Sequence, residues 1–197
     1  MMKGEDCFKQ NKSTLKNVSY DDKNKVYMTE STIPVYDFDG IKDWYWDNII
    51  KSREKGSSND ALWVDGERMI FIEFKNGNFQ LFARNGLARK LYESLFMLFD
   101  ENMPVTSICR QFRPSINYTR TNMEYILVYN GDKIPTEKHG RLAIAGSLNK
   151  LAKFGLGFYE GFLFAKVRTY TAEEFEKYFV SAIDNKMRKE IKSKIIF

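Results

Sequence analysis

Residues 60–75, with the sequence DALWVDGERMIFIEFK, restrict the fold of this chain more than any other stretch. Two runs rich in apolar residues flank the dipeptide Asp65-Gly66. Asp-Gly between two such runs is a strong signal for a β-hairpin with a two-residue turn. The second run also carries Glu73 and Lys75, although burying a charge is costly unless it is paired or binds something. The sequence therefore predicts a hairpin with a polar, functional face.

The polar residues of this hairpin are predicted to share one side. If the Asp-Gly dipeptide forms the turn, Asp60 lies opposite Phe71, because antiparallel partners are matched outward from the turn. Alternate residues of a strand point the same way, so Asp60, Glu73 and Lys75 lie together. Asp60 and Glu73 are then diagonal neighbours about 7–8 Å apart at the backbone, close enough for both carboxylates to hold one divalent cation. A turn longer by one residue would turn one strand over and separate the group.

The rest of the chain alternates helical and strand patterns. Apolar residues make up 43% of the 197 residues, which is typical of a globular domain with a sizeable core. The spacing of apolar residues predicts helices over 39–54, 87–99, 141–155 and 171–183, strands over 123–132 and 161–170, and a short strand within 103–122. Thr171 and Glu174 form the pattern of a capping box. We expect one α/β domain with a mixed sheet over 26–183, a polar and partly ordered segment over 1–25, and a basic tail over 184–197.

The composition argues against several classes of function. The single histidine, His139, argues against zinc hydrolases and nucleases that are built on several histidines. Cys7 and Cys109 are far apart and suggest neither a disulfide framework nor a thiolate metal cluster. A nucleophilic pair of Cys109 and His139 stays open, but a core cysteine and a loop histidine are the more ordinary interpretation. The net charge of +5 is compatible with nucleic acid without requiring it.

No stretch of the sequence suggests a membrane segment or an export signal. The longest uninterrupted apolar run, residues 95–99, is far too short to span a bilayer. Residues 1–13 carry early acidic residues and lack the apolar core of a signal peptide. We therefore expect a cytoplasmic protein that does not bind membranes.

The hairpin resembles the PD-(D/E)XK nuclease superfamily, which has the restriction-endonuclease-like fold. Asp60 matches the first acid of that family's motif, and Glu73-Phe74-Lys75 matches its Glu-x-Lys on the next strand. The helices expected on either side of the hairpin lie where the family's flanking helices lie, so the resemblance covers about residues 40–130. Asn59 replaces the family's proline, and no room is left between the first helix and the hairpin for another strand. An N-terminal strand such as 25–29 could replace it.

The resemblance implies a metal-dependent endo- or exonuclease. Asp60 and Glu73 would hold Mg²⁺ or Mn²⁺, with the Phe74 carbonyl as a further ligand and Asp47 of the preceding helix as an auxiliary one. The metal would orient and acidify a water for attack on a phosphodiester. Lys75 would position that water or offset charge on the phosphate. For Asp47, a solvated acidic stripe on the helix is the competing interpretation.

The partner implied by this resemblance is nucleic acid, with DNA favoured over RNA. Lys90 or Arg89 would contact phosphate from the helix after the hairpin, although solvated basic residues on a helix are common. Phosphate contacts and stacking surfaces are also predicted within 109–120, from Arg110, Arg113, Arg120, Phe112 and Tyr118. An exposed basic loop is the alternative there. The sequence leaves open a homodimer, a partner protein, and a non-catalytic binding module of the same fold.

Overall fold

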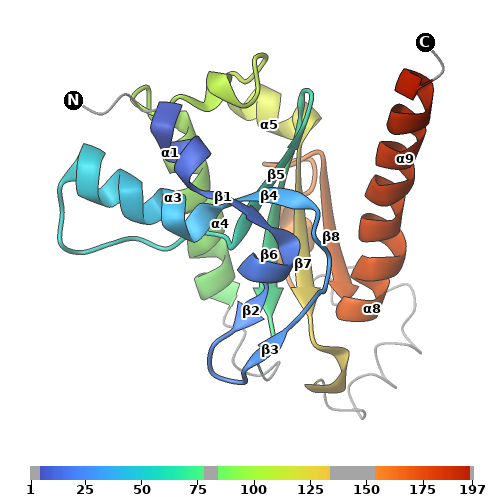
Figure 1. Ribbon diagram of the computed structural model, residues 1–197. Coiled ribbons are helices and arrows are strands. Elements are labelled where there is room, and N and C mark those ends of the chain that lie inside the picture. Colours follow the sequence, from blue (N-terminus) through green and yellow to red (C-terminus); the bar gives the residue numbers. More distant parts are fainter. Residues whose placement is uncertain (1–4, 78–83, 134–153, 196–197) are drawn as a thin grey trace.

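The computed structural model describes residues 5–77, 84–133 and 154–195. A six-stranded sheet lies at its centre, with the strand order β1-β4-β5-β6-β7-β8 (Figure 1). A small second sheet is formed by the hairpin β2 (Tyr20–Asp21) and β3 (Val26–Tyr27). The strands of the central sheet are β1 (Lys12–Thr14), β4 (Pro34–Asp37), β5 (Ala61–Asp65), β6 (Arg68–Lys75), β7 (Met123–Tyr129) and β8 (Lys166–Thr171).

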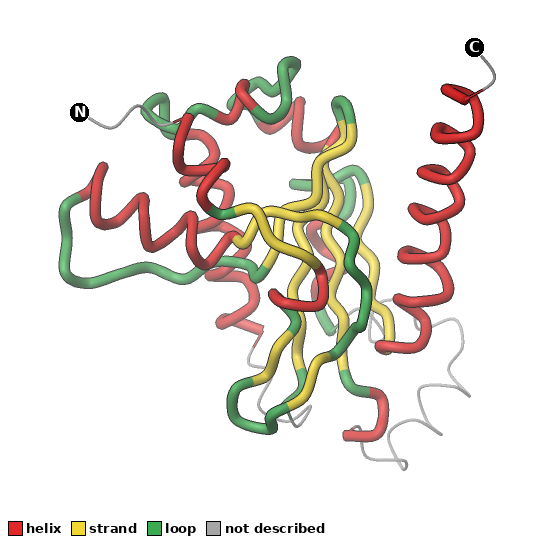
Figure 2. Tube along the Cα trace, in the orientation of Figure 1, coloured by secondary structure: helices red, strands yellow, loops and turns green. Residues whose placement is uncertain are grey.

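Helices cover both faces of this sheet (Figure 2). The α-helices are α1 (Glu5–Gln10), α2 (Leu15–Val18), α3 (Phe38–Tyr45), α4 (Arg84–Phe99), α5 (Ile116–Asn122), α8 (Ala172–Phe175) and α9 (Ser181–Ile195). A π-helical turn (Trp46–Ile50) extends α3, and another (Glu176–Val180) joins α8 to α9. Short 3₁₀ turns lie at Val105–Ser107, Gly131–Lys133 and Leu156–Tyr159.

The sheet is mixed, as the sequence predicts. In the central sheet, β1, β4, β5 and β6 pair antiparallel in this order, whereas β6, β7 and β8 run parallel to one another. The carboxyl end of β6 therefore lies at the same edge of the sheet as the start of β5. This arrangement brings the residue before β5, Asp60, next to Glu73 near the end of β6.

Two apolar clusters pack on the two faces of the sheet. On the α4 face, Leu62, Phe71 and Tyr125 pack with residues of α3 and α4 such as Ile41 and Leu91. The α9 face carries the alternate strand residues, and it packs against the segment from α8 to α9; its cluster includes Ala61, Trp63, Ile70, Ile72, Phe175 and Phe179. Alternation along β5 and β6 thus matches the predicted faces of the hairpin.

The hairpin turn lies one residue further along the chain than predicted. Asp65 pairs with Arg68, so the two turn residues are Gly66 and Glu67. Gly66 has a φ of +63°, which suits the first central position of a tight hairpin turn. Leu62, and not Asp60, therefore lies opposite Phe71. Moving the turn by one residue changes the pairing by two positions, so every side chain keeps its predicted face.

Most of the other predicted elements are confirmed, with two differences. The helices over 39–54 and 87–99, the strand over 123–132 and the capping box of Thr171 and Glu174 are all present. The stretch 103–122 holds a 3₁₀ turn and α5 in place of a strand. Within 25–29, only Val26–Tyr27 form a strand, and they pair with β2, while β4 takes the place beside β5. The helix predicted over 141–155 lies almost wholly outside the described residues, as does His139.

Both ends of the described chain contribute to the fold more than expected. Helix α1 buries Cys7 and Phe8 in the α4-face cluster, and β1 forms an edge of the central sheet. The predicted basic tail begins inside α9, whose first turns pack Ile183 against the sheet. None of the described helices is long and apolar enough to cross a membrane.

Candidate active site

Asp60 and Glu73 meet on the α4 face of the sheet. The pairing of Ala61 with Ile72 places Asp60 beside Glu73 on the neighbouring strand. The Phe74 backbone N–H donates a hydrogen bond of 2.6 Å to Asp60 Oδ2 and so fixes this carboxylate against β6. The two acids predicted to hold a metal are therefore adjacent, and they are direct neighbours across the strands.

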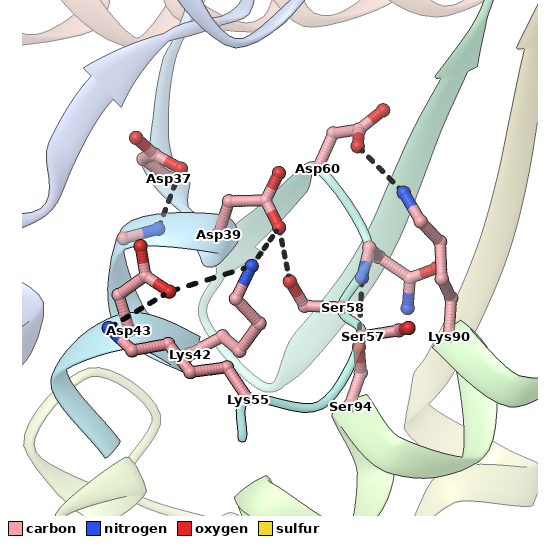
Figure 3. Close-up of polar contacts among 12 residues, drawn as sticks. Asp37, Asp39, Lys42, Asp43, Lys55, Ser57, Ser58, Asp60, Lys90 and Ser94 are labelled. Atoms are coloured by element: carbon pink, nitrogen blue, oxygen red, sulfur yellow. Dashed lines mark hydrogen bonds and ion pairs between the residues drawn. The ribbon is translucent and has the colours of Figure 1, made fainter. Parts of the chain in front are cut away.

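Two lysines converge on these acids. Lys90 Nζ, from α4, lies 3.2 Å from Asp60 Oδ1 and 2.7 Å from Glu73 Oε1, so one ammonium bridges both carboxylates. Figure 3 shows the contact between Lys90 and Asp60. Lys75 also pairs with Glu73 Oε1, from two residues further along β6. The predicted trio of Asp60, Glu73 and Lys75 is thus brought together, and Lys90 joins it.

Glu73 is the most constrained acid of the group. Its side chain has no exposed surface, and its Oε2 atom has no hydrogen-bond partner among the described residues. Burial, followed by the charge of Asp60, raises the pKa of Glu73 to about 7, against the opposing effect of the two lysines. Burial alone would lower the pKa of Lys90, but Asp60 and Glu73 raise it above its ordinary value. Glu73 therefore takes up a proton more readily than an exposed glutamate does.

A second unpartnered polar atom lies near Glu73. The Tyr125 hydroxyl is buried on the α4 face and has no hydrogen-bond partner among the described residues. Burial, and then the charges of Glu73 and Asp60, raise the pKa of Tyr125 well above its ordinary value. Within the described residues, the interior beside Glu73 thus holds one acceptor and one donor without partners, and the apolar pattern of β7 did not indicate this tyrosine.

The acid that α3 directs toward the site is Asp39. Its carboxylate accepts a hydrogen bond from the Ser58 hydroxyl and pairs with Lys42 (Figure 3). Ser58 lies two residues before Asp60, and the charge of Asp39 contributes to the raised pKa of Lys90. The side chain of Asp37 caps α3 by accepting from the Gly40 backbone N–H. The beginning of α3 is therefore the part of this helix nearest the site.

Asp47, the predicted auxiliary ligand, lies elsewhere. It follows Asp39 by eight residues, which is about 12 Å along a helix axis. Its side chain is 58% exposed and pairs with Lys55 at 2.9 Å. This position corresponds to the solvated stripe and does not place Asp47 at the two acids. The helical spacing of Asp39, Asp43 and Asp47 does not indicate which of these acids lies over a neighbouring strand.

The predicted arginines are engaged in other contacts. Arg89 pairs with Glu93 on the surface of α4. Arg113 donates to the carbonyls of Arg110 and Phe112, and Arg120 donates to the Phe162 carbonyl.

The segment 109–120 also lies at the other end of the hairpin from the two acids. Arg110 lines a pocket with Gly66 and Glu67, and the Tyr118 hydroxyl donates to the Glu67 carbonyl. Glu67 precedes Glu73 by six strand residues, or roughly 20 Å. Phe112 and Tyr118 are only 4% and 7% exposed, so they pack in the core and do not offer the predicted stacking surfaces.

The donor set for a metal consists of two carboxylates. Among residues 5–77, 84–133 and 154–195, no group of three or more histidine, cysteine, aspartate or glutamate side chains is arranged to hold a metal ion. Mg²⁺ commonly keeps several waters and binds through one or two carboxylates, so Asp60 and Glu73 match its needs. The unpartnered Glu73 Oε2 is an oxygen available for this purpose. The residues therefore fit a hard divalent cation.

No protein-family model, no curated protein and no solved structure matches this chain. The chemistry of Asp60, Glu73, Lys75 and Lys90 is therefore the basis for assigning a function to this chain.

Proposed function

We propose that this protein is a metal-dependent nuclease that hydrolyses phosphodiester bonds, in DNA more readily than in RNA. The observation that carries the proposal is the buried Glu73 beside Asp60: two lysines contact one of its carboxylate oxygens, and the other has no hydrogen-bond partner in the described part of the chain. The resemblance of Asp60 and Glu73-Phe74-Lys75 to the PD-(D/E)XK motif supports the same reaction. It also supports a restriction-endonuclease-like core made of β5, β6, α4 and β7.

In this proposal, Asp60 and Glu73 hold Mg²⁺ or Mn²⁺, and the Phe74 carbonyl is a further ligand. The bound metal supplies an acidified water and neutralises charge on the phosphate. Glu73 must be ionised to act as a ligand, so metal binding is favoured above the raised pKa of this carboxyl. Lys75, which is anchored on rigid β6, orients the water or offsets negative charge that develops on the phosphate.

The free-energy cost of burying these four charged groups favours a functional role for the cluster over a purely structural one. A buried ion pair often stabilises a protein no more than well-packed apolar residues of similar volume. Here two carboxylates and two ammonium groups are concentrated at one edge of an otherwise apolar face. Groups with raised pKa values that gather in this way are commonly found at catalytic sites.

A non-catalytic module that binds nucleic acid or a protein is the second candidate function. The observation that favours it is the Lys90 ammonium, which already bridges both carboxylates. Two acids and two lysines sum to no net charge, so the cluster is complete without a metal. Metal-dependent cleavage separates this candidate from the nuclease.

The test is cleavage of single- and double-stranded DNA and RNA with Mg²⁺, Mn²⁺ or EDTA. We expect cleavage only with metal, and a loss of about 10³-fold in Asp60→Asn and in Lys75→Met. Asp47→Asn is the matched control, because it makes the same chemical change on the exposed stripe, and we expect its activity to stay within about threefold. Cleavage that survives in Asp60→Asn would refute the proposed site. A folded wild type that binds nucleic acid and never cleaves it would favour the second candidate.

A further inference from the structure

Lys90 occupies the space between the two acids. Its ammonium lies within 3.2 Å of Asp60 Oδ1 and 2.7 Å of Glu73 Oε1. Asp60 Oδ2 is engaged by the Phe74 backbone N–H. Glu73 Oε2 is the one oxygen of the two carboxylates without a hydrogen-bond partner among the described residues. A cation held by both Asp60 and Glu73 therefore has to share oxygens with Lys90 or replace it.

The charges of the cluster make sharing unfavourable. The two acids are already balanced by Lys90 and Lys75, so a divalent cation would leave an excess of two positive charges in a largely buried place. Like charges a few ångströms apart repel strongly where solvent is scarce. Removing one ammonium from the carboxylates, and adding a phosphate, would restore the balance.

The Lys90 side chain can move away from Asp60 and Glu73 while the backbone around it stays in place. Its side chain is 23% exposed, so a path to solvent exists, and a lysine stem is flexible. The helix that carries it is held in place one turn later, where the Ser94 hydroxyl accepts a hydrogen bond from the Asn59 backbone N–H (Figure 3). The backbone before Asp60 thus remains attached to α4 when the Lys90 side chain moves.

We propose that Lys90 is an internal counter-ion that a divalent metal must displace, and that the displaced ammonium then contacts the phosphate of the substrate. The inference rests on the proposed function. Metal and nucleic acid then bind with positive cooperativity, because each favours the conformation with Lys90 withdrawn from the acids. Such a coupling is reciprocal, so DNA strengthens metal binding by the same factor as metal strengthens DNA binding.

The first test measures Ca²⁺ binding by calorimetry, since Ca²⁺ also takes oxygen ligands. We expect Lys90→Met to bind Ca²⁺ at least tenfold more tightly than the wild type in the absence of DNA. Lys75→Met is the matched control: it removes the same charge from Glu73 and leaves the bridge to Asp60 in place, so a smaller gain is expected. Equal gains in both variants would mean a general charge effect and would overturn the role of Lys90.

The second test measures the coupling itself. Ca²⁺ should bind the wild type at least tenfold more tightly when a short DNA duplex is present, and this enhancement should disappear in Lys90→Met. Wild-type protein that binds Ca²⁺ with an affinity unchanged in Lys90→Met would overturn the inference and leave the proposed function standing. If neither protein binds Ca²⁺, the proposed metal site and the inference fail together.

A third measurement avoids any variant that fails to fold. Acetylation of wild-type lysines, followed by mass spectrometry, reports whether the Lys90 ammonium is free. We expect Lys90 to react slowly in EDTA and at least fivefold faster with saturating Ca²⁺, while Lys186 on the surface of α9 changes little. Lys90 that stays protected at saturating Ca²⁺ would overturn the inference.

Discussion

Glu73 and Glu124 are the two acidic residues buried in the described part of the chain, and they lie on opposite faces of the sheet. Each contacts two basic side chains. Glu124, on β7, pairs with Arg68 and Arg168 on the neighbouring strands, on the same face as Ile126. Glu73 pairs with lysines and has a second carboxylate, Asp60, beside it.

The difference between these two glutamates separates a structural ion pair from a candidate site. Each oxygen of Glu124 lies against a different arginine, Oε1 against Arg68 and Oε2 against Arg168, although Oε2 has no hydrogen-bond partner among the described residues. Lysines are point charges that exchange partners more easily, and both lysines contact the same oxygen of Glu73, whose other oxygen has neither an ion pair nor a hydrogen-bond partner among the described residues. The ion pairs therefore occupy both oxygens of Glu124 but only one oxygen of Glu73, and the other oxygen of Glu73 is available to a ligand.

The largest expected difference between the two acids is in activity. Glu73→Gln should lower nuclease activity about 10³-fold or more, because the amide is a poor ligand for a hard cation. Glu124→Gln should keep activity within about threefold, since it lies on the α9 face. Initial cleavage rates with Mg²⁺ for both purified variants provide the measurement. A comparable loss in Glu124→Gln would remove the distinction between the two residues.

The second largest expected effect is the dependence of protein stability on pH, which arises from Glu73. The pKa of Glu73 is about 7 in the folded protein and near its ordinary value when unfolded, so the folded state binds more protons between these values. The free energy of unfolding of the metal-free wild type should therefore fall as the pH rises from about 4.5 to 7, by ~3 kcal/mol at most from this group.

Urea unfolding in EDTA at pH 5 and pH 8 measures this effect. Glu73→Gln has no proton to lose, so its stability relative to the wild type should be greater at pH 8 than at pH 5. A difference between wild type and variant that is the same at both pH values would show that Glu73 does not titrate in this range.

The faces of the hairpin could be predicted from the sequence, whereas its register could not. Alternation places Asp60, Glu73 and Lys75 together whichever of two adjacent dipeptides forms the turn, because the two registers differ by an even number of residues. Gly66 belongs to both dipeptides and has the positive φ that a turn over either one needs, so only the pairing of Asp65 with Arg68 in the folded chain distinguishes them. The acids are consequently closer than the sequence indicated.

The contact of Lys90 with both acids could not be predicted from the sequence. Its helix was predicted from the leucines that face the sheet, and Lys90 comes directly before Leu91 on the flank of that face. The pair Lys90 and Ser94, at helical spacing, was a usable signal for a polar edge over the hairpin. Which residue of that edge reaches Glu73 depends on how α4 packs on the sheet, and no local pattern determines this.

Removing the structural pair should cost an intermediate amount of stability. Glu124→Gln removes the carboxylate charge that pairs with Arg68 and Arg168, and the expected loss is about 1–2 kcal/mol. It is smaller than for a fully buried pair because the Arg68 side chain is 46% exposed and therefore screened. Urea unfolding at low and high salt tests this, and the loss should shrink in 1 M NaCl. A loss that does not depend on salt would indicate a packing effect in place of an ion pair.

The smallest predicted effect concerns two buried tyrosines of the α4 face, Tyr118, which has hydrogen-bond partners, and Tyr125, which has none among the described residues. Tyr118→Phe removes a hydroxyl that donates to the Glu67 carbonyl and contacts Cys109 Sγ, so it should cost about 1 kcal/mol. Tyr125→Phe removes a buried hydroxyl without a partner among the described residues, so its stability should equal that of the wild type or exceed it by up to about 1 kcal/mol. Urea unfolding of both variants provides the comparison. If Tyr125→Phe is instead the more destabilised of the two, its hydroxyl contacts a bound water or Glu73 in solution, and the interior beside Glu73 is already occupied before any metal arrives.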